Sequence, residues 1–67
     1  MESDALGSAR SRYRAAYDAY QACARRVAQK LESGSELDAK ELVEEAQAIE
    51  RLTQARRQFL EAIMRPQ

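Results

Sequence analysis

Two charged residues of this chain, Glu45 and Arg56, fall within a periodic run of apolar residues rather than opposite it. A charge in such a position is costly to bury unless an opposite charge or a hydrogen bond accompanies it. Lys30 is within reach of Glu45, and the ring of Tyr13 or Tyr17 is a suitable surface for the Arg56 guanidinium. Alternatively, both charges set the register of contact with a specific partner. Neither has neighbours that would complete a catalytic site, so no enzyme activity is expected.

Three tyrosines, Tyr13, Tyr17 and Tyr20, recur at helical spacing and therefore share one face of a helix. Such a stripe can stack nucleic-acid bases, but this spacing is more typical of a core or a protein interface. Cys23 extends the stripe. The chain has no histidine and no second cysteine, so Cys23 has no activating neighbour and is expected to be an inert buried thiol. The sequence predicts no metal and no cofactor.

Arginines are frequent near both ends of the chain. On a helix Arg10 and Arg14 share one flank, while Arg12 points to the other. A solvated charged face is the default interpretation, and a contact with the backbone of RNA or DNA is the alternative. The candidates for that contact are Arg10, Arg14, Arg56 and Arg57. With 11 basic and 11 acidic residues the net charge is zero, so the whole molecule is not attracted to nucleic acid or to an anionic membrane.

Apolar residues in each half of the chain recur at steps of three or four, or at sums of such steps, which keeps them on one face of an α-helix. A short break around Gly34 separates the two runs. Together they predict an all-α fold, an antiparallel two-helix hairpin. The first run contains Leu6, Ala9, Tyr13, Ala16, Tyr20, Cys23 and Val27, and the second contains Leu42, Ile49, Leu52, Phe59 and Ile63.

Capping signals place the boundaries of a single domain, residues 1–67. We expect a first helix over about 4–32, a turn over about 33–37, a second helix over about 38–64 and a short C-terminal tail. Gly34 stands where a left-handed residue commonly ends a helix. Asp38 as N-cap puts Glu41 at the third helical position, which makes a capping box.

The second helix carries more apolar surface than one neighbouring helix covers, over an arc of roughly 200°. A chain of 67 residues is also near the lower limit for an independent core. We therefore expect homodimerisation into a four-helix bundle, or docking on a helical partner. Ala48, Ala55 and Ala62 are expected at the outer edge of the second helix. The full predicted interface is Tyr13, Tyr17, Tyr20, Ala48, Leu52, Ala55, Phe59, Ala62 and Ile63.

Charge is unevenly distributed along the predicted hairpin. Residues 36–50 carry six acidic residues against Lys40 alone, whereas most arginines fall near the two chain ends. Two antiparallel hairpins would place a basic end beside an acidic turn. Exposed ion pairs are each worth only about 0–1 kcal/mol, so the sequence leaves the orientation of a dimer open.

In length and topology the chain resembles small helical-hairpin proteins. These include the plasmid RNA-binding Rop protein, which dimerises into a four-helix bundle, and the hairpin co-chaperones of type III secretion needle subunits. The resemblance spans the whole chain but involves no motif, so no functional residue is carried over. It implies a bacterial interaction module, adaptor or small chaperone. The alternative is a small dimeric RNA- or DNA-binding regulator.

The sequence predicts a cytoplasmic protein. No apolar run approaches the length of a transmembrane helix, and the acidic N-terminus lacks the basic flank of a signal peptide. A lone cysteine fits a reducing compartment.

Overall fold

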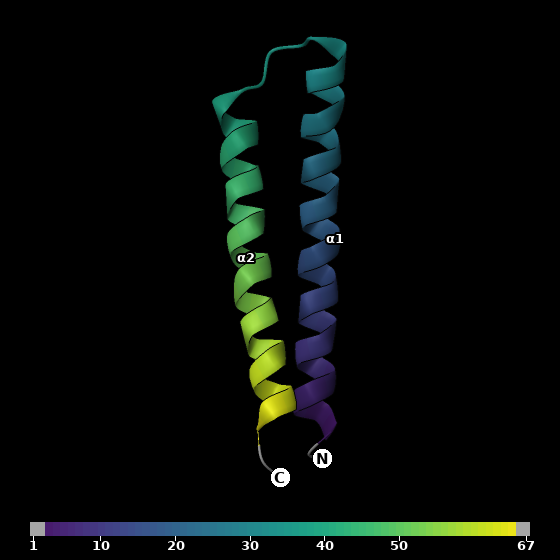
Figure 1. Cartoon of the computed structure of the whole chain (residues 1–67), viewed down its shortest axis with the longest axis vertical. Coiled ribbons are helices and arrows are strands. Elements are labelled where there is room, and N and C mark those ends of the chain that lie inside the picture. Colours follow the sequence, from purple (N-terminus) through teal and green to yellow (C-terminus); the bar gives the residue numbers. More distant parts are fainter. Residues whose placement is uncertain (1–2, 66–67) are drawn as a thin grey trace.

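The computed structural model describes residues 3–65, which form two long helices joined by one turn. Helix α1 spans Ser3–Ser33 and α2 spans Ala39–Met64. The helices run antiparallel and pack along their length, with the turn at one end of the rod and both chain ends at the other (Figure 1). The rod measures 52 × 14 × 14 Å. The predicted all-α hairpin is confirmed, while the predicted tail beyond Arg65 lies outside the described residues.

Helix α1 ends in a Schellman motif. Gly34 has a φ of 75°, in the left-handed region that an L-residue enters only at a cost. The backbone N–H of Ser35 donates to the carbonyl of Lys30 at 3.0 Å, and that of Gly34 donates to the carbonyl of Leu31 at 3.4 Å. These two bonds satisfy carbonyls that the end of the helix leaves without partners. The role predicted for Gly34 is confirmed.

Helix α2 begins at the predicted capping box. Asp38 is the N-cap, with an extended backbone, and Glu41 is the third helical residue. The Glu41 Oε1 atom accepts the backbone N–H of Asp38 at 3.1 Å. The turn between the two helices is therefore fixed by backbone hydrogen bonds on one side and by a side chain on the other.

The helices meet along a continuous seam whose members follow one another at alternating steps of three and four residues. A strict repeat of this kind has a period of 3.5 and wraps two helices around each other in a left-handed sense. Among the described residues, all those that are buried or half-buried belong to this seam apart from Ala24, Leu37 and Glu44. The seam comprises Leu6, Ala9, Tyr13, Ala16, Tyr20, Cys23, Val27 and Lys30 of α1 with Glu41, Glu45, Ala48, Leu52, Ala55, Phe59 and Ala62 of α2.

Two contacts fix the register of the seam. The rings of Tyr13 and Phe59 pack with their centroids 5.5 Å apart and tilted by 42°, as the hairpin geometry predicts. Towards the turn, the Lys30 Nζ atom lies 2.6 Å from Glu41 Oε1. We call each level of the seam, where a residue of α1 faces one of α2, a layer. In this register large residues of the two helices face each other in one layer, and small residues do so in the next.

The position predicted for the alanines of α2 is wrong. Ala48 and Ala55 are buried and Ala62 is half-buried in the seam, so they do not form an outer edge. Ile49 and Ile63, expected at the centre of the packed face, are instead 44% and 53% exposed. The physical reason is that α1 presents a small residue in every second layer. Opposing alanines let the two backbones approach closely there, which larger side chains would prevent.

We expect Gly34→Ala to lower the free energy of unfolding by about 1 kcal/mol or more, because alanine would have to adopt the positive φ at this position. Gly7→Ala is the matched control. Gly7 lies inside α1 with nothing near the position of a new Cβ, so this change should raise stability by about 0.5–1 kcal/mol. Urea denaturation at one fixed protein concentration measures both. Equal effects of the two changes would contradict the Schellman assignment.

Candidate functional site: the apolar face

The seam divides the surface of the rod into two long faces. In each helix, the residues that precede a seam residue by one position in the sequence lie on one face of the rod. Arg26 of α1 and Glu44 of α2 are two of them, and their side chains lie 3.7 Å apart across that face. Further along this face Ser8 and Arg12 share a surface hollow with Gln58. The residues that follow a seam residue by one position in the sequence therefore lie on the opposite face. We call it the apolar face: Arg10, Arg14, Tyr17, Gln21, Ala24, Ala28 and Leu31 of α1 with Leu42, Ala46, Ile49, Thr53, Arg56, Leu60 and Ile63 of α2.

The two faces differ sharply in chemistry. Every residue that α2 contributes to the face opposite the apolar one is charged or a glutamine: Lys40, Glu44, Gln47, Arg51, Gln54, Gln58 and Glu61. On the apolar face, by contrast, Tyr17, Leu42, Ile49, Leu60 and Ile63 are each 44–53% exposed, and Leu31 is 65% exposed. Large hydrophobic patches on one side of a soluble protein commonly mark a binding surface.

The hairpin buries little of itself. The described core consists of Ala9, Ala48 and Ala55, and none of the larger described side chains is fully buried. The accessible surface is 5517 Å², whereas a compact monomer of 7.6 kDa would expose about 4,300 Å². The radius of gyration is 15.4 Å, against about 11 Å for a compact domain of this length. The rod therefore exposes about 1,200 Å² more than a compact monomer would.

The predicted interface residues are divided between the seam and the surface. Tyr13, Tyr20, Leu52 and Phe59 are half-buried in the seam, where they contribute to the contact between the two helices. Tyr17 lies on the apolar face, and its hydroxyl accepts a hydrogen bond from the Gln21 side-chain amide at 3.4 Å. Of the three tyrosines, Tyr17 is the one that offers most of its ring to a partner.

Arginines occupy the end of the apolar face near the chain ends. Arg10 and Arg14 line an open surface hollow together with Tyr13, Tyr17 and Phe59.

On α2, Arg56 and Arg57 border a second hollow with Leu52 and Leu60. All four candidate arginines are exposed, and Arg57 lies to the side of the apolar face. The structure thus brings the predicted arginines to one end of the rod, although not into a single row.

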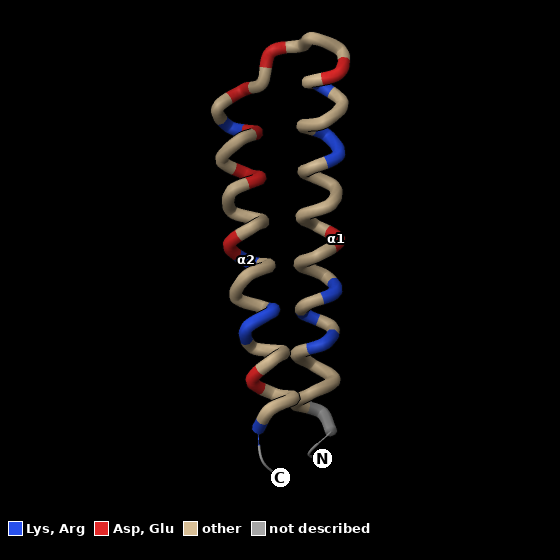
Figure 2. The backbone as a smooth tube through the Cα atoms, viewed as in Figure 1, with Lys and Arg blue, Asp and Glu red and all other residues tan. Residues whose placement is uncertain are grey.

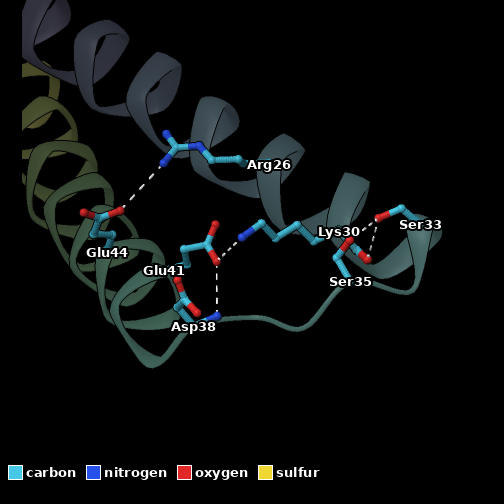
Figure 3. Close-up of polar contacts among 7 residues, drawn as sticks. All are labelled: Arg26, Lys30, Ser33, Ser35, Asp38, Glu41 and Glu44. Atoms are coloured by element: carbon cyan, nitrogen blue, oxygen red, sulfur yellow. Dashed lines mark hydrogen bonds and ion pairs between the residues drawn. The ribbon is translucent and has the colours of Figure 1, made fainter.

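The half of α2 nearer the turn carries most of the helix's acidic residues, and the half nearer its C-terminal end carries more basic residues than acidic ones (Figure 2). Figure 3 shows how part of the acidic charge is paired at the turn. Glu41 Oε1 accepts from Lys30 Nζ at 2.6 Å and from the Asp38 backbone at 3.1 Å, while Arg26 pairs with Glu44.

The Lys30–Glu41 contact changes the proton affinity of both groups. The hydrogen bond to Glu41 raises the pKa of Lys30 above its ordinary value of 10.5. The hydrogen bond from Lys30, and then the one from the Asp38 backbone, lower the pKa of Glu41 below its ordinary value of 4.5. Both shifts favour the charged forms, so the contact stabilises the turn most between these two values.

The expected pairing of Glu45 with Lys30 is wrong, because Lys30 pairs with Glu41. Glu45 is half-buried in the seam. Within residues 3–65, no cation lies within ion-pair distance of it. Glu41 is one helical turn closer to the turn of the hairpin, where the register brings it level with Lys30.

The sequence contains a signal for the apolar face that an average helical wheel conceals. The residues of α2 on this face follow one another at alternating steps of four and three, directly beside those of the seam. On a wheel of period 3.6 the two rows merge into one wide arc. On a wheel of 3.5 residues per turn the two rows separate. The seam row then has an alanine at every seventh position, starting from Ala48.

No group of three or more His, Cys, Asp or Glu side chains that could hold a metal is found within residues 3–65. Cys23 is a free, half-buried thiol. In the described part of the chain, neither helix is long and apolar enough to cross a membrane. Comparison with protein-family models, with curated proteins and with solved structures finds no match to this chain.

The Lys30–Glu41 contact predicts a specific pH dependence of stability. Because the pKa of Glu41 is lowered, its contribution is present above its ordinary value of 4.5 and is lost as the pH falls through the lowered value. Because the pKa of Lys30 is raised, its contribution is lost only as the pH rises through a value above 10.5. Glu41→Gln should therefore lower the urea midpoint at pH 7 and have a progressively smaller effect as the pH falls below 4.5.

Glu50→Gln is the control, since Glu50 is exposed and lies outside the cluster of Figure 3. It should change the midpoint less than Glu41→Gln does at pH 7. A difference between wild type and Glu41→Gln that stays constant from pH 7 to pH 3 would show that the contact does not stabilise the turn.

Proposed function

We propose that this protein is a non-enzymatic interaction module, an adaptor, small chaperone or accessory protein, that acts by docking its apolar face on a helical protein surface. The observation that carries the proposal is that six of the eight exposed large hydrophobic residues described lie on one face, with Ile49 and Leu60 at 44% exposure, whereas α2 presents only charged residues and glutamines on the opposite face. A face of this kind is stable in water when another apolar surface covers it.

The shape of the apolar face indicates a helical partner. Its residues form two parallel rows with the spacing of a helix pair, and apolar rows of this kind pack against the apolar face of another helix or helix pair. The large area left exposed also links binding to folding. A partner that binds only the folded hairpin raises its stability by mass action. The lone thiol of Cys23 fits a reducing compartment, which supports a cytoplasmic location as part of this proposal. The bacterial source that we propose rests only on the resemblance in length and topology to bacterial hairpin proteins.

Photo-crosslinking in the cells that make the protein tests this function. We expect a photoreactive phenylalanine at Thr53, on the apolar face, to cross-link to protein, and one at the neighbouring Gln54, on the opposite face, not to do so. Adding Ile49→Asp should abolish the product, because a charge would then have to be buried in the contact.

Val43→Asp is the matched control for Ile49→Asp. Val43 is a β-branched residue of the same helix, is 53% exposed and lies outside both the seam and the apolar face. This variant should leave the product unchanged. Equal products from Thr53 and Gln54, or a product that survives Ile49→Asp, would refute the proposed docking face.

The alternative function is binding of RNA or DNA by the end of the rod where α1 begins and α2 ends. The observation in its favour is that Arg10, Arg14, Arg56 and Arg57 are all exposed at this end, and that two of them border a hollow lined by tyrosine rings. Arginine with stacked aromatic rings is a common means of holding single strands.

Salt dependence separates the alternative from protein docking. If four arginines contact phosphates, affinity for a fluorescent single-stranded 20-nucleotide RNA should fall about 50-fold between about 50 and 200 mM salt. Arg10→Ala with Arg14→Ala should flatten this slope, whereas Arg25→Ala, on the half of α1 near the turn, should leave it unchanged. Fluorescence anisotropy measures both. No binding at the lower salt concentration would rule out this function.

A further inference from the structure

We propose that the occupant of the apolar face is a second copy of this chain, docked face to face and antiparallel, with α1 on the partner's α1 and α2 on the partner's α2. This inference rests on the proposed docking function and names its partner. Three observations carry it: the size pattern along the face, the distribution of charge and the exposed area.

The register of the seam places Gln21 of α1 level with Arg51 of α2, near the middle of the rod. A two-fold axis at this level gives two antiparallel copies the longest overlap. It brings Leu42 level with the partner's Leu60, so that exposed leucines cover each other at both ends of the contact.

The same axis matches bulky residues of the apolar face with small ones. Residues about equally far from the axis on opposite sides face each other in such a pair, and in three of these pairs one residue is large and the other is alanine. Interdigitation of this kind lets the helices pack at native density. The pairs are Tyr17 with the partner's Ala24, Arg14 with the partner's Ala28, and Arg56 with the partner's Ala46.

The distribution of charge along the rod favours an antiparallel pair of copies over a parallel one. Each copy carries Arg10, Arg14 and Arg56 at one end of the apolar face. A parallel pair would gather these guanidinium groups from both copies at the same end, where like charges repel. In the antiparallel pair the arginines of each copy lie toward the turn end of the other, which carries more acidic than basic residues although no acidic residue lies on its apolar face. Arg56 then comes close to the partner's Glu45, the half-buried carboxylate that has no cation nearby in its own chain.

The exposed area agrees with a dimer of this kind. A stable protein interface buries about 800 Å² on each partner. The hairpin exposes 5517 Å², about 1,200 Å² more than a compact monomer of its mass. An interface of about 800 Å² on each copy would remove about two-thirds of this excess.

A charge swap tests the pairing. We expect the wild-type chain to sediment at twice 7.6 kDa. Glu45→Arg and Arg56→Glu should each raise the dimer dissociation constant about ten-fold, because the two-fold axis repeats every contact. The double variant should return it to within about three-fold of wild type. Glu45 and Arg56 lie about 16 Å apart along their own helix, so the rescue can arise only between copies.

A distance measurement tests the orientation independently of any interface residue. Glu36→Cys in the exposed turn, on a Cys23→Ala background, accepts a spin label. In an antiparallel dimer the two labels should lie nearly the 52 Å length of the rod apart. In a parallel dimer they would be about 10–20 Å apart, one or two interaxial distances. Circular dichroism checks that the labelled chain remains helical.

The outcomes separate this inference from the function on which it rests. A dimer with a short label distance, or a charge swap without rescue, overturns the antiparallel pairing and leaves the docking face intact. A monomer in solution whose Thr53 probe cross-links to a different protein overturns the second copy as the occupant. The absence of any face-specific cross-link overturns both proposals.

Discussion

The close approach of two helix backbones at layers of small residues is the constraint on which the rest of this structure depends. Ala9, Ala48 and Ala55 are buried where the helices meet, and a larger side chain in these layers would push the axes apart. Once the alanines face inward, the rotation of each helix about its axis is fixed. Every other residue then has a determined position: the aromatic pair of Tyr13 and Phe59 in the alternate layers, polar residues on one side and exposed hydrophobic residues on the other.

This packing has an energetic consequence. Burial of an alanine removes little apolar surface from water, and the hydrophobic contribution to stability scales with that area. A rod whose buried described residues are alanines therefore has a small stability of its own, and its larger apolar side chains are half-buried or exposed. The capping box at Asp38, the Schellman motif at Gly34 and the Lys30–Glu41 contact offset part of this deficit at the turn. The remainder can come from whatever covers the apolar face, so that folding and association are thermodynamically linked.

Much of the fold was predictable from local chemistry. Glycine at a position of positive φ, and an aspartate followed three residues later by glutamate, each have a nearly unique structural meaning, and both motifs formed as predicted. The rotation of α2 was not predictable from a helical wheel. Hydrophobicity alone ranks Ile49 above Ala48 as a packed residue, whereas the structure favours Ala48 because of its size relative to the facing helix. The partner of Lys30 was equally ambiguous, because Glu41 and Glu45 are one turn apart and only the register of the seam chooses between them.

The hairpin is also a spacer of defined length. Helix α1 begins and α2 ends at the same end of a rod that is 52 Å long (Figure 1). A domain fused to either helix would therefore extend away from the turn, and both long faces would remain uncovered. An antiparallel pair of such rods would hold its two attached domains at opposite ends. The separation between them would be set by the number of helical residues, at 1.5 Å per residue, rather than by the flexibility of a linker.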